Sequence, residues 1–286
     1  MFANALVQFY LFWHGRLGLP GAGLLLRLAR KLDPALHDFP LCLDGQRVGR
    51  LDFRDQASFS LLNYRAGDLG NHRFLFQEMA ARLRPGDVLW DVGANVGLVS
   101  LYFAQDQFSL KKIHSFEPSP GPWKTLQSLF LSDPRVSPHP WGLSSSAGEG
   151  CLVGQGGDSS YGAIRLSEKA GPGEKVFLRA GDQLVLSGLE PPHLIKIDVE
   201  GHEPAVLAGL KETIRKYGPA IFFEHIFLSP GQIRSLIPPG YKLSFLLEDG
   251  TWTEDFDQRF LGHEALLSPP PGEALFLPKA VRPGGS

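Results

Sequence analysis

Short apolar runs alternate with segments of helical pattern along this chain from about residue 74 onward. Such an alternation is typical of a parallel sheet that is covered by helices on both faces. The sequence therefore predicts an α/β fold. The runs that we expect to form strands are Val88–Val92, Ile113–Phe116, Val136–Leu143, His193–Val199 and Ala220–Glu224.

Helices are expected between these strands, with prolines and glycines marking several of their ends. The expected helices are Phe74–Leu83, Val96–Gln105, Trp123–Leu131, Pro204–Tyr217 and Pro230–Leu236.

Four further segments complete the expected fold. Ser144–Gly162 is rich in glycine and serine, which predicts a mobile loop or an irregular hairpin near a site. Lys175–Leu186 is interpreted as part strand and part helix. The last two predicted strands, Tyr241–Leu247 and Ala274–Leu277, are expected to close the sheet as an antiparallel pair.

Composition limits the class of protein. At 286 residues and 43% hydrophobic, the chain can bury one large core. Its 28 basic and 30 acidic residues nearly cancel, which argues against a nucleic-acid partner. The two cysteines, Cys42 and Cys151, form no CxxC or other metal-ligand pattern. This usage suits a reducing compartment, and we expect a cytoplasmic protein.

The N-terminal segment is apolar at first and then basic. Residues 1–13 contain Asn4 and Gln8 and fall short of the roughly 20 apolar residues that span a bilayer, so no transmembrane helix is predicted. Residues 1–31 carry basic residues, no acidic residue, and leucines at helical spacing. They suit a helix that packs on the core or caps its pocket, and a weaker alternative is a helix at a membrane surface or on a partner.

A glycine turn follows the first predicted strand, with the sequence Asp91-Val92-Gly93-Ala94-Asn95-Val96-Gly97. Glycine at a first strand-to-helix turn lets a nucleotide-like ligand approach the backbone closely. In the dinucleotide fingerprint a second glycine receives the pyrophosphate, but here that position is Asn95. S-adenosylmethionine has no phosphate, so the departure favours it over NAD. A tight turn without a ligand is the alternative.

Two acidic residues and an aromatic residue extend this predicted cofactor site. Asp91 ends the first strand, where it can meet the cationic amino end of the ligand, while the N–H groups of the turn meet its carboxylate. Glu117 ends the second strand, where a carboxylate can accept both ribose hydroxyls. Trp141 follows the third strand and is expected either to flank the adenine or to belong to the core.

Charged residues interrupt the strand His193–Val199, although a central parallel strand should be nearly all apolar. Lys196 and Asp198 are spaced by two and therefore share a face near the carboxyl end, where ligands bind. One reading is a structural ion pair, with Glu200 and Glu203 favouring the start of a helix. The other places Asp198 beside a methyl acceptor whose hydroxyl must lose a proton, with Lys196 assisting.

Glu224 and His225 end the next strand and are predicted to reach the same edge of the sheet. Together with Asp198 they include the oxygen ligands that a hard divalent ion prefers. A lone histidine is more often a hydrogen-bonded structural residue than a metal ligand, so we predict no metal site. We assign Glu224 and His225 to catalysis. His202 suits either a substrate contact or a polar helix start.

Five segments of the sequence resemble the FkbM family of S-adenosylmethionine-dependent methyltransferases. They are DVGANVG at 91–97, FEP at 116–118, LIKIDVEGHE at 194–203, AIFFE at 220–224 and ALFLPK at 274–279. The resemblance spans roughly residues 60–280. It implies a Rossmann-like class I methyltransferase fold, with a mostly parallel seven-stranded sheet, an antiparallel closing strand and helices on both faces.

The resemblance also implies roles for residues of this chain. The implied cofactor contacts are Asp91, Gly93, Asn95, Gly97 and Glu117, and Asp198 is the implied acid at the methyl acceptor. We also assign their neighbours Ala94 and Pro118 to the cofactor site. Two stretches depart from the family pattern, namely Trp141–Ser144 and the glycine-rich Gly154–Gly162. We expect residues 71–280 to be the methyltransferase domain, residues 1–70 an N-terminal helical extension or substrate cap, and residues 281–286 a flexible tail.

The expected reaction is O-methylation of a small-molecule or glycan hydroxyl on a sugar, a polyketide or another secondary metabolite. Two alternatives remain at this point. One is a methyltransferase that acts on a protein or nucleic-acid nitrogen, although the chain lacks an Asn/Asp-Pro-Pro-aromatic motif. The other is a partner protein that binds S-adenosylmethionine without catalysis, against which Lys196, Asp198 and Glu224 argue.

Overall fold

A computed structural model describes most of the region in which the predicted elements lie. The described residues are 39–43, 46–51, 72–154, 164–167, 173–247, 249–255 and 261–270. Several sequence expectations fall outside them: the basic segment 1–31, most of the glycine-rich stretch 154–162, the strand 274–277 and the tail 281–286. No helix among the described residues is long and apolar enough to cross a bilayer.

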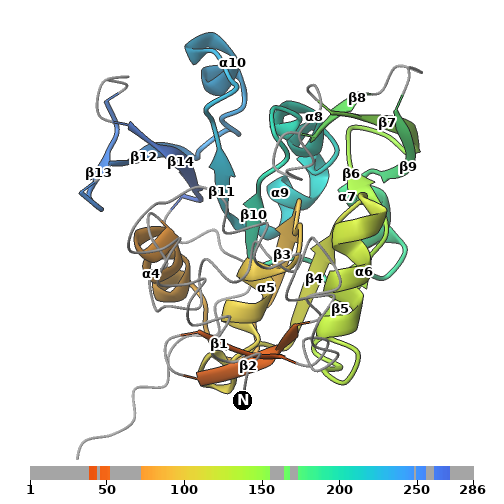
Figure 1. Cartoon of the computed structure of the whole chain (residues 1–286). Helices are drawn as coiled ribbons and strands as arrows, with labels where there is room; N and C mark the ends of the chain where they lie inside the picture. Colours follow the sequence, from red (N-terminus) through yellow and green to blue (C-terminus); the bar gives the residue numbers. More distant parts are fainter. Residues whose placement is uncertain are drawn as a thin grey trace, which may run out of the picture.

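A central mixed sheet has the strand order β13-β12-β14-β11-β10-β3-β4-β5 (Figure 1). The strands from β11 to β5 in this order run parallel. They are β11 (Ala220–Glu224), β10 (Leu194–Ile197), β3 (Val88–Val92), β4 (Lys112–Phe116) and β5 (Val136–His139). This arrangement confirms the Rossmann-like α/β fold.

The remaining strands of the central sheet are antiparallel. Strand β14 (Leu261–Ser268) lies between β11 and β12 (Lys242–Leu247), and β13 (Trp252–Thr253) forms the edge. The described residues thus contribute eight strands, whereas seven were predicted. The sequence prediction missed β14 because Gly262-His263-Glu264 interrupts its apolar pattern.

Helices cover both faces of the sheet, as predicted (Figure 1). Side chains of a strand alternate between the two faces, so Leu89 packs on one side and Trp90 on the other. The first face carries α4 (His72–Arg82), α5 (Leu98–Phe103) and α6 (Pro120–Leu129). The second face carries α7 (Gly181–Leu186), α8 (Glu203–Ala208), α9 (Lys211–Tyr217) and α10 (Pro230–Ser235).

A second, smaller sheet has the order β6-β9-β7-β8. Its strands are β6 (Gly142–Leu143), β9 (Glu174–Arg179), β7 (Gly148–Gly154) and β8 (Ile164–Ser167). The single strand predicted over 136–143 is therefore split between β5 and β6. Pro138 and Pro140 lack the N–H donor that a continuous strand needs, which explains the break.

Two other predicted elements also differ. The helix expected over 204–217 is divided into α8 and α9 at Gly209, where a Cβ would lie 2.0 Å from the carbonyl oxygen of Ser144. The described part of the predicted helical extension is a hairpin of β1 (Phe39–Leu43) and β2 (Gln46–Leu51), not a helix. The division of the chain at residue 70 stays a prediction.

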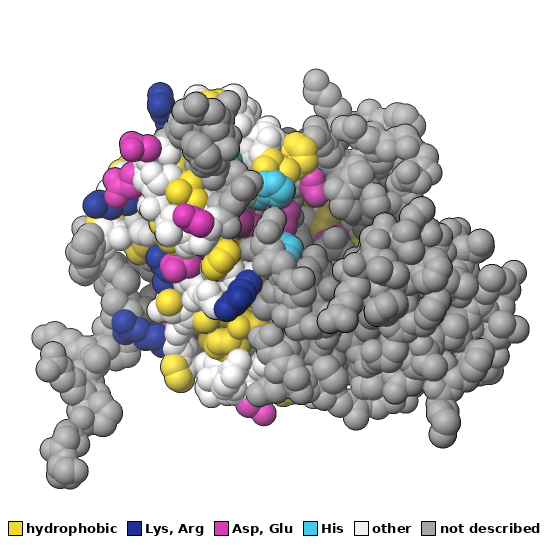
Figure 2. Space-filling view, turned by 60° about the vertical axis from the view of Figure 1, so that its left-hand side comes forward, with side chains coloured by type: hydrophobic (Ala, Val, Ile, Leu, Met, Phe, Trp, Pro, Cys, Tyr) yellow, Lys and Arg dark blue, Asp and Glu magenta, His cyan; other side chains and the backbone are white. Residues whose placement is uncertain are grey.

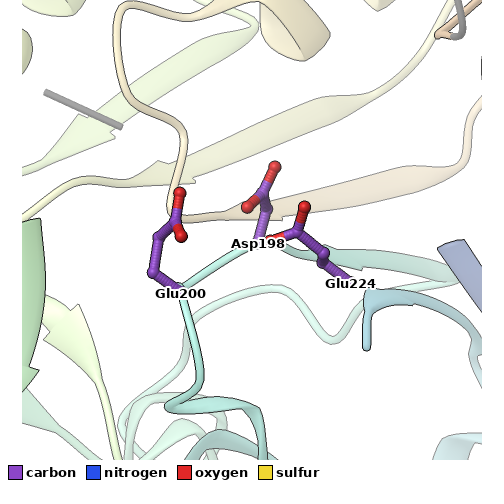
Figure 3. A group of neighbouring side chains, drawn as sticks. All are labelled: Asp198, Glu200 and Glu224. Carbon is purple, nitrogen blue, oxygen red and sulfur yellow. The ribbon is translucent and has the colours of Figure 1, made fainter. Parts of the chain in front are cut away.

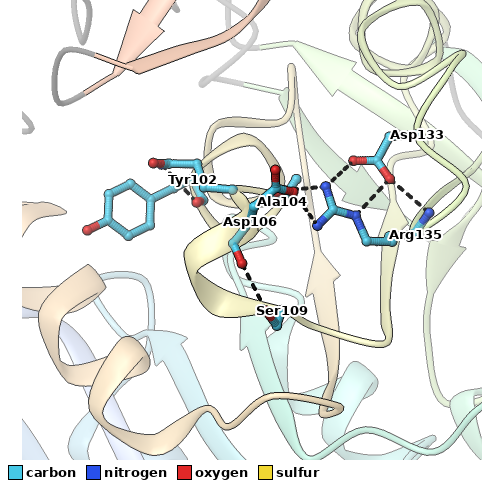
Figure 4. Close-up of polar contacts among 7 residues, drawn as sticks. Tyr102, Ala104, Asp106, Ser109, Asp133 and Arg135 are labelled. Carbon is cyan, nitrogen blue, oxygen red and sulfur yellow. Dashed lines mark hydrogen bonds and ion pairs between the residues drawn. The ribbon is translucent and has the colours of Figure 1, made fainter.

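Arg135 connects several segments near the amino ends of the strands (Figure 4). Its Nε and Nη2 donate to Asp133 at 3.0 and 2.8 Å, and Nη2 also donates to the carbonyl oxygen of Ala104 at 2.7 Å. Its Nη1 lies 3.0 Å from Oδ1 of Asp106, in the short helix η3 (Asp106–Phe108). In such folds, ligands bind at the carboxyl ends of the strands. The Arg135 network lies at the opposite edge of the sheet.

Candidate active site

The glycine turn adopts a left-handed backbone at three positions, with φ of 79° at Gly93, 50° at Asn95 and 91° at Gly97. A Cβ on Gly93 would lie 1.9 Å from the carbonyl oxygen of Asp198, and one on Gly97 would lie 2.5 Å from Leu126. Both glycines are therefore required by contacts within the chain itself. The turn and the end of β10 touch through Gly93.

Four N–H groups of the turn donate to acceptors inside the protein. Those of Gly93 and Ala94 donate to the carbonyl oxygen of Phe116 at 3.0 Å, and that of Gly97 donates to Ala94 at 2.8 Å. The N–H of Asn95 donates to Oε2 of Glu117 at 2.8 Å. The expectation that N–H groups of the turn meet the ligand carboxylate stays a prediction, and these four groups already have an acceptor within the protein.

Glu117 is buried and joins two loops. Its Oε2 accepts from Asn95, and its Oε1 accepts from the N–H of Ser119 at 2.7 Å. Burial raises the pKa of Glu117, and the N–H donors oppose that effect. A carboxylate oxygen has two lone pairs, so each oxygen retains one acceptor site. These are the acceptor sites that two ribose hydroxyls need.

A pocket lies at the carboxyl edge, between the glycine turn and the turn that follows β10. Its lining consists of Val92, Gly93, Asn95, Glu117, Pro118, Ser119, Pro122, Gly142, Leu143, Leu152, Asp198, Val199, Glu200 and His202. Of the predicted site residues, Gly93, Asn95, Glu117, Pro118 and Asp198 meet in this pocket. Leu152 was not named as a site residue, although it lies in the stretch 144–162 that was expected near a site.

Four predicted cofactor residues lie outside the lining. Ala94 and Gly97 are buried within the turn. Asp91 is 2% exposed and accepts from the hydroxyl of Ser100, while burial raises its pKa to about 6. Trp141 is half-buried and packs against the core, with 4.9 Å between its ring centre and that of His139. Its neighbour Gly142 lines the pocket.

Three carboxylates come together beside the pocket, and Figure 3 shows them at the ends of neighbouring strands. Oxygen atoms of Asp198, Glu200 and Glu224 lie within 4.8 Å of one another. Glu200 has a left-handed φ of 55°, which turns the chain after β10. Carboxylate oxygens suit a hard divalent cation, and Glu200 stands in this group where the sequence suggested His225.

Glu203 and His202 hold the turn in place. Oε1 of Glu203, which is 1% exposed, accepts from the N–H groups of Val199 and Gly201, each at 3.2 Å. Nε2 of His202 lies 2.9 Å from the hydroxyl of Ser144, at the end of β6. Glu203 therefore does more than favour a helix start, because it fixes the backbone that carries Asp198 and Glu200.

Lys196 is buried among carboxylates. Its Nζ lies 3.1 Å from Oε1 of Glu264 and 3.7 Å from Oδ2 of Asp198. Burial disfavours its charged form, but Glu264 and Asp198 outweigh this effect and raise the pKa of Lys196. The predicted pair of Lys196 and Asp198 thus exists, together with Glu264 from the strand that the sequence did not reveal.

Glu224 and His225 point to opposite faces of the sheet. Burial and the nearby charge of Asp198 raise the pKa of Glu224 to about 8. Oε2 of Glu224 is buried without a hydrogen-bond donor from the described residues. The ring of His225 instead lies 5.2 Å from that of Phe245 on the other face. The structure therefore brings Glu224 to the site and does not bring His225.

Comparison with known proteins agrees with this arrangement. Residues 91–247 match the Methyltransferase FkbM domain. Hexuronic acid methyltransferase AglP of Haloferax volcanii is 29% identical over 68% of this chain and 78% of its own length. 31-O-demethyl-FK506 methyltransferase FkbM of Streptomyces tacrolimicus is 28% identical over 50% of this chain and 70% of its own.

A solved structure of an FkbM methyltransferase from Methylobacillus flagellatus KT aligns with a TM-score of 0.45 and 16% identity. The alignment covers 86% of this chain and 60% of that one. The family match covers more than half of the present chain and includes both the glycine turn and the carboxylate cluster. The chain therefore belongs to the FkbM methyltransferase family.

Proposed function

We propose that this chain transfers the methyl group of S-adenosylmethionine to a hydroxyl group of a sugar, glycan, polyketide or other secondary metabolite. One observation carries the proposal: a single pocket is lined by Gly93, Asn95 and Glu117 on one side and by Asp198 and Glu200 on the other. The names of the two relatives specify hexuronic acid and 31-O-demethyl-FK506, which supports an acceptor that carries hydroxyls.

The residues on the first side of the pocket fit the adenosine part of S-adenosylmethionine. Glu117 has an acceptor site for each ribose hydroxyl, and Pro118 and Gly142 offer apolar surface for the adenine. Ala94 and Gly97 shape the turn from within. Asp91 acts through Ser100 in this arrangement, since its carboxylate accepts from that hydroxyl and does not line the pocket.

S-adenosylmethionine supplies a methyl group on a cationic sulfur. As the acceptor oxygen bonds to the methyl carbon, the carbon–sulfur bond breaks with its electron pair on sulfur, and the hydroxyl proton must leave. Asp198 lies in the pocket, with one oxygen 3.7 Å from Nζ of Lys196, and its carboxylate can take that proton. Alignment of the hydroxyl by Asp198 and Glu224 would supply much of the acceleration.

Methyl transfer and ligand binding test the proposal together. We expect S-adenosylmethionine, and not NAD, to bind the purified protein in a calorimetric titration. Asp198→Ala should retain that binding and lose at least about 100-fold in turnover of a hydroxyl acceptor. Glu117→Ala should weaken S-adenosylmethionine binding by at least about tenfold, because two hydroxyls lose a charged acceptor.

The catalytic assignment fails if Asp198→Ala folds and still transfers methyl groups at the original rate. The protein is a binding partner without catalysis if S-adenosylmethionine binds but no hydroxyl compound is methylated. Transfer only to protein or nucleic-acid nitrogens would establish the other alternative.

A further inference from the structure

Two large apolar side chains are exposed in the loop that follows β11. Ile226 and Phe227 are 45% and 39% exposed, although they come directly after the buried end of that strand. A Cβ on Gly201 would lie 3.3 Å from the Cβ of Phe227, so the phenylalanine packs closely over the turn that follows β10. Because Gly201 follows Glu200, the apolar pair stands beside the carboxylate cluster.

The polar part of this region offers acceptors and little positive charge. Oε2 of Glu224 is buried without a hydrogen-bond donor among the described residues, so a hydroxyl on the acceptor can satisfy it. Lys196 is 2% exposed and already paired with Glu264 and Asp198. Burial, followed by the charge of Lys196, lowers the pKa of the nearby His72, which favours its neutral form.

Apolar and acidic surfaces side by side match the two kinds of surface on a sugar ring. Figure 2 shows hydrophobic side chains next to histidines and carboxylates on one side of the molecule. A pyranose presents a face of C–H groups that packs against an aromatic ring, and hydroxyls that donate to carboxylates. A sugar carboxylate, by contrast, would meet the like charges of Asp198 and Glu200, whose oxygens lie within 4.8 Å of each other and of Glu224.

We infer that the acceptor is a sugar ring that carries no carboxylate, with its C–H face on Phe227 and its hydroxyls donating to Asp198 and Glu224. This inference rests on the proposed function and narrows it. The acceptor class then differs from that named for the Haloferax volcanii relative, which is hexuronic acid.

Matched acceptors test the charge preference. Methyl glucoside, methyl glucosaminide and methyl glucuronide, with their galactose counterparts, are each incubated with the full chain and labelled S-adenosylmethionine. We expect kcat/KM for the hexosides and hexosaminides to exceed that for the matching hexuronides by at least about tenfold. Glu200→Gln should reduce this ratio, because it removes one repelling charge.

Substitutions at the apolar pair test the sugar-ring contact. Phe227→Ala should raise KM for the preferred sugar by about tenfold and leave KM for S-adenosylmethionine unchanged, and Phe227→Tyr should restore the original value. Phe177→Ala is the matched control, because Phe177 is 58% exposed on β9. It should change neither KM.

The inference is overturned, and the proposed function stands, if hexuronides are methylated as well as hexosides or if only non-sugar alcohols such as a macrolide are methylated. It is also overturned if Phe227→Ala behaves like Phe177→Ala. If S-adenosylmethionine binds and no sugar, macrolide or other alcohol accepts a methyl group, the proposed function fails and the inference fails with it.

Discussion

Glu224 shows how a single half-buried acid links the site to stability. Its pKa is about 8 in the folded chain, because of burial and the charge of Asp198, and lies near 4.5 in an unfolded chain. The folded state therefore holds this proton more tightly than the unfolded state does. The resulting stability is fully present below about pH 4.5 and is lost as the pH rises through about 8.

Glu224→Gln removes this dependence, because an amide has no proton to lose. We expect the variant to match the original chain in free energy of unfolding near pH 5 and to exceed it near pH 9 by about 1 kcal/mol or more. Urea denaturation at both pH values measures the difference. Glu174→Gln, an exposed position on β9, is the control. Equal pH dependence of Glu224→Gln and the original chain would contradict the role given to Glu224.

Among the elements, the turn between β10 and α8 does most to assemble the site. It carries Asp198 and Glu200. One oxygen of Glu203 accepts hydrogen bonds from the N–H groups of Val199 and Gly201, and these bonds fix the turn. The contact of Gly93 with the carbonyl of Asp198 joins this turn to the glycine turn. A change in its backbone should therefore move the acid relative to the methyl group.

We expect Glu203→Ala to lower kcat by at least about tenfold in protein that circular dichroism shows to be folded. Glu203→Gln should recover most of that loss, because its amide oxygen can accept from the same two N–H groups. A purely structural role predicts a different pattern, in which both variants lose stability and the folded fraction keeps its original kcat. Stopped-time methyl-transfer assays at saturating acceptor distinguish these results.

The local pattern of apolar residues predicted the strands whose limits are set by residues nearby in the sequence. The strands β3 and β11 were predicted at their observed bounds, since both are short apolar runs with clear limits. The break between α8 and α9 could not be predicted, because Gly209 matters only through its approach to Ser144, which is distant in sequence. The same holds for β14, whose charged Glu264 is explained by Lys196.

At the scale of the whole molecule, the carboxyl ends and the amino ends of the parallel strands differ in role. The carboxyl edge holds the pocket and the carboxylates, and the amino edge is fastened by the network of Arg135. We expect Arg135→Ala to lower the free energy of unfolding by about 1–2 kcal/mol, because several partners lose their donor, and to leave kcat unchanged. Chemical denaturation and a methyl-transfer assay measure the two quantities.

Arg215→Ala is the control for this comparison, since Arg215 is largely exposed on α9 and pairs only with Glu212 among the described salt bridges. It should change stability by less than about 0.5 kcal/mol. A large loss of turnover in Arg135→Ala would show that the two edges are not independent.

The sequence predicts where the site lies better than it predicts which side chains point into it. Residues at the ends of parallel strands meet at one edge whatever their contacts, so the placement of Glu117, Asp198 and Glu224 at this edge was predicted. The direction of a side chain at a strand end is harder to predict. His225 follows Glu224 directly and therefore faces the other way, and Trp141 packs against the core beside His139.

The two hydrogen bonds of Glu117 have a consequence for affinity. One oxygen accepts from the loop after β3 and the other from the loop after β4, so hydrogen bonds within the protein hold both loops. Ordering a loop during association costs conformational entropy, which lowers affinity. If a nucleoside binds between these loops as we propose, it meets loops that the hydrogen bonds of Glu117 already hold together, and less conformational entropy is lost on binding.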